Sequence, residues 1–487
     1  METPLHEYQK QAIRFALKAF ASPSHGCGLF LEPGLGKTLT SIAVMDIMHA
    51  ADPHARFLVI APALVARNSW PDELERWKNM HSLTWAAAVG TPRQRSKALD
   101  AGADVTVIGQ DNLKWLDGKV GDWPWKGIVV DELSGYKTPR SNRGLILRRH
   151  ARQAKWTLGL TGTPATKNLL DLWGEIAVID RSETLERSMT RYRDRWFTPT
   201  RYIDMGGRRQ PIDYTPRDGA QQEILDLIEP FCLSMKASDR LPGLPSMIET
   251  DHWLDMPKPT RDTYDQMRRQ MVAELGDGTT VTAANAGVLT AKLAQLTCGC
   301  LYPDADDPDG PIRHVDDVKL DALADIIGAA DGPVLVFYQF KDELERMRAR
   351  FPGMREVHEQ GVLEEWRNGR VPLLAAHPQA AKYGLNIQDG GHEIVWTSLP
   401  WSFDDYRQAC DRLHRQGQKR TVRVHRLLES NTVDRRKLDV LTGRMMLHEA
   451  VMDALEGETA AADRTPQQVL LLRRRVEAEP VRPLELP

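Results

Sequence analysis

The sequence predicts an α/β protein with two parallel-sheet domains and a helical insertion between them. Short apolar runs alternate with helical patterns from residue 5 to about residue 172, and the alternation resumes after about residue 316. The stretch between them contains helical patterns separated by breaks rich in Gly, Pro and Asp. We therefore expect domains at 1–172 and 316–455, an insertion at 173–315 and a tail at 456–487.

The strands expected in the first domain are residues 28–31, 57–61, 105–109, 127–130 and 156–160, and each ends in polar, Gly or Pro residues. Those of the second domain are 334–337, 371–375, 393–397 and 422–427. In the insertion we expect helices at 218–227 and 259–275. Ligands of such sheets bind beyond the carboxyl ends of the strands, so functional residues should collect there.

Composition indicates a soluble globular chain. Of 487 residues, 41% are hydrophobic and 27% are charged, and the net charge of −3 means that any contact with nucleic acid needs a local basic surface. The five cysteines lack the spacing of a zinc site or a disulfide framework, so we expect a reducing compartment and assign no metal to them. No signal peptide or membrane-spanning stretch is apparent, and we expect no membrane partner.

A phosphate-binding loop follows the first strand. Gly34 and Gly36 allow the backbone to turn tightly around an anion, Lys37 can neutralise phosphate oxygens, and Thr38 can bind Mg²⁺. The full pattern has a glycine where this chain has Leu31, so an ordinary glycine-containing turn is the alternative. The loop predicts hydrolysis of a nucleoside triphosphate.

Two adjacent carboxylates end the strand at 127–130. We expect Asp131 to hold Mg²⁺ and Glu132 to orient and deprotonate the attacking water. Most Asp-Glu pairs are solvated turn residues, but this pair follows an apolar strand in a chain that also carries Lys37.

The segment Thr161-Gly162-Thr163-Pro164 follows another strand. Its hydroxyl groups could connect the phosphate site to a bound partner, and a simple turn before a helix is the alternative.

Gln408, Arg412 and Arg415 are spaced four and three residues apart, which would place them on one helical face. Arginines donated by one domain to the nucleotide site of another stabilise the transferring phosphoryl group. A basic surface helix is the alternative.

Together, in this order, these segments resemble the superfamily-two helicases, and within them the Swi/Snf-type DNA translocases. Leu5-His6-Glu7-Tyr8-Gln9 resembles the adenine-reading segment, and residues 57–62 with 68–77 resemble the first DNA-strand motif. Residues 160–164 resemble the third motif, and 411–418 resemble the family's Arg-x-His-Arg-x-Gly-Gln signature. Residues 375–388, with Asp131-Glu-Leu-Ser134 and Lys137, are similar to the compact helicases of bacteriophages and prophages.

The resemblance covers residues 5 to about 434 and implies two RecA-like domains that close over ATP and Mg²⁺. It implies catalytic roles for Lys37, Asp131, Glu132, Arg412 and Arg415. The nucleotide-binding residues would be Gln9, Pro33, Gly34, Leu35, Gly36, Lys37, Thr38, Gly384 and Gln408, with Thr38 and Asp131 as metal ligands. The nucleic-acid contacts would be Pro62, Asn68, Trp70, Thr161, Thr163, Asn168 and His377.

The chain also departs from the family pattern. Ser134 stands where many relatives have His, and residues 232–236 lack an arginine pair that relatives carry before their lysine. The stretch 340–373 is short, and no chromodomain-like, bromodomain-like or nuclease segment is recognisable, so chromatin remodelling is not implied.

These features predict an ATP-dependent translocase that acts on DNA, expected to be double-stranded and bound without sequence specificity, in phage replication or recombination in the bacterial host cytoplasm. A helicase directed at RNA or single strands is one alternative. A nucleotide-gated adaptor that recruits a phage nuclease or replication protein is another.

Overall fold

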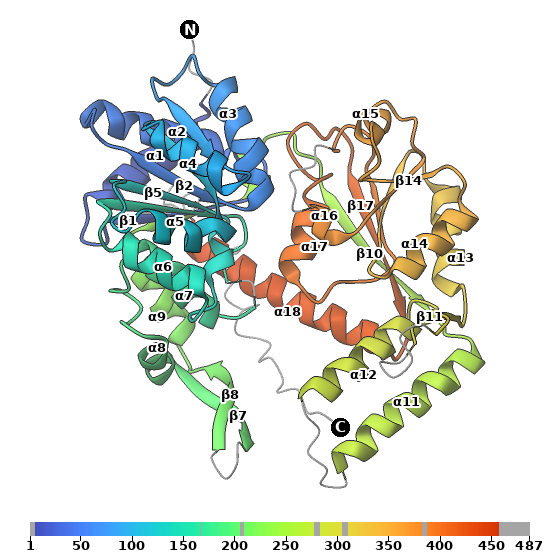
Figure 1. The fold of residues 1–487 in the computed structure, drawn as a ribbon. Coiled ribbons are helices and arrows are strands. Elements are labelled where there is room, and N and C mark those ends of the chain that lie inside the picture. Colours follow the sequence, from blue (N-terminus) through green and yellow to red (C-terminus); the bar gives the residue numbers. More distant parts are fainter. Residues whose placement is uncertain are drawn as a thin grey trace. The chain divides into compact units, whose positions relative to one another are not determined.

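The computed structural model describes residues 5–165, 167–204, 209–276, 283–303, 310–381 and 387–456. The described chain divides into two compact units. Unit 1 contains residues 5–242 together with 446–456, and unit 2 contains the described residues of 243–445. Each unit is built on one large sheet, so the expected α/β class is confirmed (Figure 1).

The sheet of unit 1 has seven strands in the order β3-β4-β2-β5-β6-β1-β9, and every pairing is parallel. The central strands are buried along their whole length, as expected for apolar strands covered on both faces. The strands are β1 (Gly26–Leu31), β2 (Phe57–Ala61), β3 (Trp85–Ala88), β4 (Val105–Gly109), β5 (Gly127–Asp131), β6 (Trp156–Thr161) and β9 (Cys232–Met235).

Helices connect these strands and cover the sheet. They are α1 (Glu7–Phe20), α2 (Lys37–Ala51), α3 (Trp70–Arg76), α4 (Pro92–Asp100), α5 (Leu113–Lys119), α6 (Asn142–Ala151), α7 (Leu170–Ile179), α8 (Met189–Trp196), α9 (Ala220–Ile228) and α10 (Ala237–Arg240). Short turns of other helix types are the π-helix η1 (Val65–Ser69) and the 3₁₀-helices η2 (Gln110–Asn112) and η3 (Leu133–Tyr136). An antiparallel hairpin, β7 (Phe197–Asp204) and β8 (Arg209–Pro216), extends away from the body of the unit (Figure 1).

The sheet of unit 2 has six parallel strands in the order β10-β17-β16-β13-β15-β14. Hydrophobic clusters built around residues such as Trp366 and Met347 cover it with buried side chains. The strands are β10 (Met247–Leu254), β13 (Val334–Phe337), β14 (Met354–Glu356), β15 (Leu373–Ala376), β16 (Glu393–Trp396) and β17 (Val422–Glu429), with a small pair β11 (Cys300–Leu301) and β12 (Arg313–His314) beside them.

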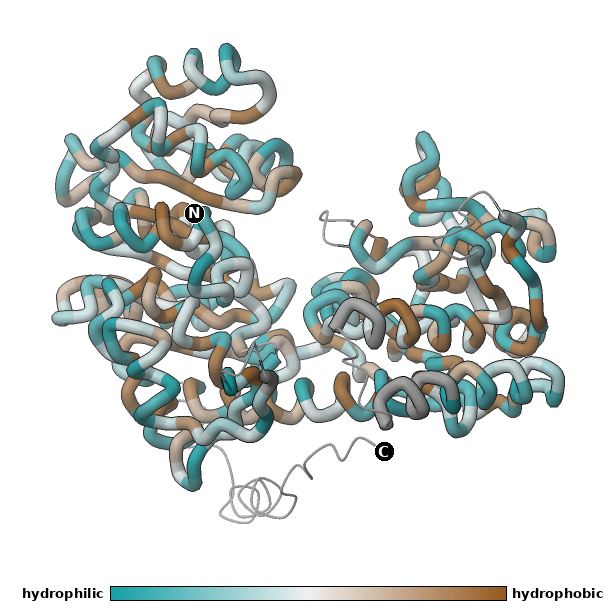
Figure 2. The backbone as a smooth tube through the Cα atoms, turned by 60° about the horizontal axis from the view of Figure 1, so that its bottom comes forward, coloured by the Kyte–Doolittle hydropathy of each residue, from teal (hydrophilic) through white to brown (hydrophobic). Residues whose placement is uncertain are grey.

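The helices of unit 2 are α11 (Lys258–Gly276), α12 (Ala283–Leu296), α13 (Val318–Ala329), α14 (Lys341–Arg350), α15 (Val362–Arg367), α16 (Pro378–Ala381) and α17 (Phe403–Cys410). The long helix α18 (Val433–Ala454) begins in unit 2 and ends in unit 1. Hydrophobic and hydrophilic residues alternate along the outer helices of both units, as expected for helices that pack on one side only (Figure 2).

The stretch 173–315 does not form a helical unit of its own. Its strand β9 joins the edge of the first sheet beside β1, and its strand β10 joins the edge of the second sheet beside β17. The hairpin β7–β8 also lies within it. Sheet edges accept additional strands because their backbone N–H and C=O groups lack partners, and this long-range pairing divides the expected insertion between the two units.

Local elements differ from expectation in smaller ways. Strands β3 and β14, each short, extend the sheets beyond the strands that the sequence predicts. Apart from Glu456, the expected tail at 456–487 lies outside the described residues. None of the helices in the described ranges is long and apolar enough to cross a lipid bilayer.

Candidate nucleotide-binding and catalytic site

The phosphate-binding loop connects the carboxyl end of β1 to the first residue of α2. Gly34 and Gly36 both adopt left-handed backbone conformations, with φ of 90° and 72°. Gly36 caps α2, and its carbonyl accepts a hydrogen bond from the amide of Thr40 at 3.0 Å. Glycine adopts this conformation at little steric cost, so the turn from β1 into α2 depends on these two residues.

Lys37 begins α2, and its side chain folds back over the loop. Its Nζ donates to the carbonyl of Leu31 at 2.8 Å. A Cβ atom at Gly162, which follows β6 in the neighbouring position of the sheet, would lie 3.5 Å from the same Nζ and 3.3 Å from the Leu31 carbonyl oxygen. The residue after β6 is therefore packed closely against the lysine.

Gln9 from α1 lies against the same loop. Its side chain is buried, and its Nε2 donates to the Leu35 carbonyl at 3.4 Å while its Oε1 accepts from the His6 amide at 2.9 Å. A Cβ atom at Gly36 would lie 2.4 Å from Gln9 Nε2. Helix α1 thus supplies a fixed amide side chain to the phosphate-binding loop.

Asp131 is the last residue of β5 and is buried. Its Oδ2 accepts a hydrogen bond from the Trp70 indole at 2.9 Å, and its Oδ1 accepts from the Glu132 amide at 3.1 Å. Burial raises the pKa of the Asp131 carboxyl, while the Trp70 hydrogen bond and the positive charge of Lys37 oppose that shift. A lysine, a buried carboxylate and its indole donor thus form one electrostatic group at the carboxyl edge of the sheet.

Glu132 follows Asp131 in a left-handed conformation, with φ of 56°. This conformation is unfavourable for residues other than glycine, by about 1–3 kcal/mol, and such residues cluster at functional sites. Glu132 is only half-buried, whereas the Asp131 side chain is buried. The two carboxylates therefore sit in different environments.

The residues expected to contact nucleic acid fall into two groups. Asn68, on the π-helix η1, and Asn168 are exposed, and Pro62 and His377 are half-buried. In contrast, Trp70 is fully buried, as are Thr161 and Thr163.

Trp70, Thr161 and Thr163 were predicted to contact nucleic acid, and in this structure their side chains lie in the interior of unit 1. The Trp70 indole serves Asp131, and the Thr161 hydroxyl accepts from the Thr163 amide at 3.1 Å. The sequence around Trp70 does not show whether its side chain lies on the surface or donates a hydrogen bond in the interior, because an indole can do either.

The arginine segment of unit 2 is not fully helical. Helix α17 ends at Cys410, so Gln408 lies on the helix while Arg412 and Arg415 lie in the turns that follow. Arg412 and Arg415 are both half-buried, and burial lowers the pKa of Arg415. The expected single helical face is therefore not observed, and Gly384, also assigned to the nucleotide, lies outside the described residues.

Gln418 holds this segment in place. Its Nε2 donates to the carbonyls of Gln388 and Gly391, both at 3.0 Å, and its Oε1 accepts from the amides of Lys419 and Arg420. Gln418, the last residue of the signature segment, thus holds the turns after α17 through backbone contacts within unit 2.

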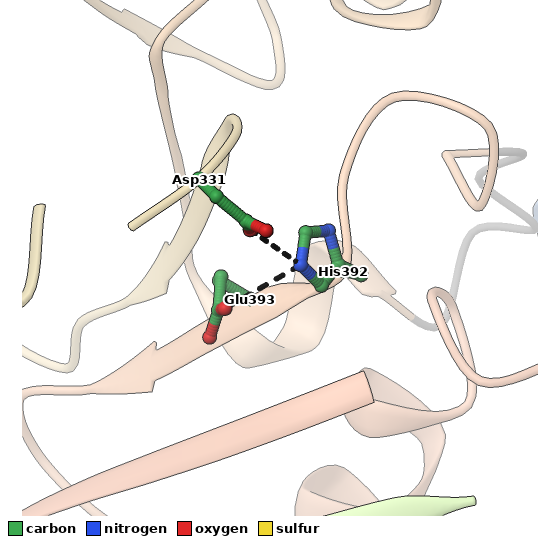
Figure 3. A group of neighbouring side chains, drawn as sticks. All are labelled: Asp331, His392 and Glu393. Carbon is green, nitrogen blue, oxygen red and sulfur yellow. Dashed lines mark ion pairs between the residues drawn. The ribbon is translucent and has the colours of Figure 1, made fainter. Parts of the chain in front are cut away.

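A second cluster of titratable groups lies where the strands of unit 2 begin (Figure 3). The Nε2 of His392 lies 3.0 Å from an Asp331 oxygen and 3.5 Å from a Glu393 oxygen. However, Arg420 pairs with Asp331, and Arg423 pairs with Glu393 at 2.5 Å. Because each carboxylate already has a cationic partner, we interpret this cluster as an ion-pair network that joins the strand ends.

Comparison with known proteins identifies two family models along the chain. Residues 8–300 match the SNF2-related domain, and residues 318–417 match the helicase conserved C-terminal domain. Putative protein p41 of Acyrthosiphon pisum secondary endosymbiont phage 1 is 30% identical over 87% of this chain and 93% of its own length. An uncharacterized ATP-dependent helicase of Mycoplasma genitalium is 25% identical over 90% of this chain. The matched region spans only 41% of that longer protein.

Among solved structures, the Sulfolobus solfataricus SWI2/SNF2 ATPase core in complex with dsDNA is 22% identical to this chain. The structural alignment covers 97% of each chain, with a TM-score of 0.44.

Proposed function

This chain belongs to the SNF2-related family and is an enzyme of the ATP-dependent helicase class, and we propose that it moves along duplex DNA by hydrolysing ATP. The observation that carries the proposal is the grouping in unit 1 of Lys37, Asp131 and Gln9 around one glycine-containing loop. Such a loop before a helix is suited to nucleotide phosphates.

For the nucleotide, we assign the adenine to Gln9 and the phosphates to the loop from Pro33 to Thr38. The left-handed glycines support an anion-binding turn, and Lys37 neutralises phosphate oxygens. A buried Asp131 carboxylate and the Thr38 hydroxyl are hard oxygen donors of the kind that Mg²⁺ prefers, so these residues fit the metal. Bound Mg²⁺ would neutralise charge on the β- and γ-phosphates.

For hydrolysis, we assign Glu132 to the attacking water, because it is the less buried of the two carboxylates and has a left-handed backbone conformation of the kind that clusters at functional sites. The hydrogen bond from Trp70 orients Asp131 and favours its ionised form. Arg412 and Arg415 of unit 2 are assigned to the charge of the transferring phosphoryl group.

For DNA, we assign the exposed Asn68 and Asn168, with Pro62 and His377. Asparagine side chains and backbone amides contact phosphate and sugar without reading sequence. The relative that is 30% identical over most of both chains is a phage protein, which supports a phage origin for this chain. A role in phage replication or recombination in a bacterial host is part of the proposal. A nuclease or replication protein of the same phage is the proposed protein partner.

The test is ATP hydrolysis by the purified chain without nucleic acid and with duplex DNA, single-stranded DNA or RNA. We expect duplex DNA to stimulate hydrolysis most, and the Lys37→Ala variant to abolish hydrolysis under every condition. If only single-stranded DNA or RNA stimulates hydrolysis, the proposed substrate changes from duplex DNA to that nucleic acid. Hydrolysis that survives in the Lys37→Ala variant would overturn the assignment of the site.

A further inference from the structure

A projecting, arginine-rich element of unit 1 has no role in the site described above. We call helix α8 and the hairpin β7–β8 the arginine arm (Figure 1). From the start of α8 to the end of β8, residues 189–216 contain six arginines, three aspartates, and no lysine or glutamate, a net charge of +3 in a chain whose net charge is −3. Arg195, at the base, pairs with Glu186 and Glu223 outside the arm. Positive charge is therefore concentrated on this one element.

The base of the arm is rigid. Tyr192 of α8 is buried and packs against the buried rings of Trp196 and Phe197, with ring centroids 5.2 Å apart in each pair. Arg217, at the end of the hairpin, donates to the Arg195 and Asp194 carbonyls at 3.1 and 2.8 Å. These contacts fix the direction in which the hairpin leaves unit 1.

The arm is also tied to a segment assigned to DNA. The hydroxyl of the buried Tyr192 donates to the Leu169 carbonyl at 2.8 Å, next to the exposed Asn168. Arg193 of α8 lies over the Tyr214 ring of β8 at 4.7 Å. The hairpin, its supporting helix and the Asn168 segment are therefore one connected structure.

Beyond its base, the arm is exposed. Tyr202 is 50% exposed, and nearly all described side chains of β8 are exposed or half-buried. Arg201 pairs with Asp213 at 2.9 Å, but both side chains keep more than half of their surface in solvent. Isolated two-stranded ribbons are marginally stable in water, so this long exposed ribbon is expected to gain order from a bound partner.

We propose that the arginine arm binds the backbone of duplex DNA and extends the path that starts at Asn168. Arginine pairs with phosphate through two parallel hydrogen bonds, and a two-stranded ribbon has the width of the major groove. A protein partner would need a buried apolar anchor, and Ile212, 38% exposed, is the one large aliphatic side chain among the described exposed residues of the ribbon. The inference rests on the proposed function.

The test compares two variants that remove the same charge. The arm variant combines Arg191→Ala, Arg201→Ala and Arg209→Ala, three exposed residues. The control combines Arg14→Ala, Arg348→Ala and Arg350→Ala, which are exposed and paired with carboxylates outside the arm. Affinity for a 40-base-pair duplex of arbitrary sequence is measured as a function of salt concentration.

Counterion release makes each phosphate contact contribute about eightfold to affinity at 0.1 M salt and about 0.9 to the slope of log K against log salt. For the arm variant, the loss of two to three contacts should weaken binding by about 60- to 500-fold at 0.1 M salt and make the slope about two to three units shallower. The control should match the wild type. ATP hydrolysis without DNA should be unchanged in both variants, which also shows that they fold.

A second measurement keeps the arm intact. All five native cysteines are buried, so a Thr200→Cys variant carries one accessible thiol on β7 for a photocrosslinker. We expect this thiol to crosslink to duplex DNA, and an added acidic peptide should not compete.

The outcomes separate the two proposals. If the wild type neither binds duplex DNA nor is stimulated by it, the proposed function fails. If the wild type binds but the arm variant binds with the same affinity and slope, or Thr200→Cys gives no crosslink, only the arm is refuted. Competition by acidic peptide would instead assign the arm to an acidic protein.

Discussion

The Trp70→Phe substitution tests how Asp131 is held in its working state. The Trp70 indole is fully buried and donates to the Asp131 carboxylate at 2.9 Å. Phenylalanine retains most of the aromatic bulk but has no N–H group, so the carboxylate loses one of its two described donors, while the Glu132 amide remains. The substitution therefore changes the hydrogen bonding of Asp131 more than the packing around it.

The magnitude follows from the type of hydrogen bond. A hydrogen bond to a charged group is worth about 1.5–3 kcal/mol, and about 1.4 kcal/mol corresponds to a tenfold change. We therefore expect kcat for ATP hydrolysis to fall between about 10-fold and 150-fold, or the Mg²⁺ concentration for half-activation to rise by a similar factor. ATP binding in the absence of Mg²⁺ should change little, because the loop that carries Lys37 is untouched.

Trp125→Phe is the matched control. Trp125 is also buried in unit 1, and its indole donates to the Thr106 hydroxyl at 3.2 Å. Thr106 lies near the start of β4, at the opposite edge of the sheet from Asp131, and its hydroxyl is uncharged. Both variants should lose similar thermal stability, but only Trp70→Phe should lose turnover or require more Mg²⁺. Equal kcat and Mg²⁺ dependence in the two variants would refute the assigned role of Trp70.

Three further substitutions address other groups. Glu132→Gln should bind ATP and hold it without turnover, because the amide cannot accept a proton from water; rapid release of product in a single-turnover assay would contradict this. Arg415→Ala should retain nucleotide binding and lose turnover by roughly 10³-fold or more, as measured for arginines donated to phosphoryl transfer; unchanged kcat would remove it from the reaction. Burial raises the pKa of Glu429 to about 8. The folded protein therefore holds this proton more tightly than the unfolded chain, whose glutamate pKa is near 4.3, so stability falls as pH rises from about 4.5 to 8. Because glutamine cannot ionise, Glu429→Gln should lose less thermal stability than the wild type between pH 5 and pH 8, and parallel Tm profiles would contradict the buried, protonated carboxyl.

Continuous motifs were readable from the sequence. Strands β2 and β4 have the expected bounds, because short apolar runs between turn residues define a buried strand locally. The phosphate-binding loop and the Asp131–Glu132 pair are predicted for the same reason, because each motif consists of neighbouring residues; their roles are part of the proposed function. The expected α/β class of two parallel sheets is confirmed, and the family match agrees with the resemblance.

Which distant segments meet depends on the folded chain as a whole. The short β9 and the edge strand β10 carry patterns compatible with several partners, and pairing with β1 and β17 assigns them to different units. Trp70 shows the same principle for a side chain, because its 61-residue separation from Asp131 is bridged only when β5 and the turn after β2 lie together. The local motifs, namely the loop, the carboxylates and the arginines, can be read from neighbouring residues in the sequence. Folding determined their partners, because burial and hydrogen bonding depend on residues that are far apart along the chain.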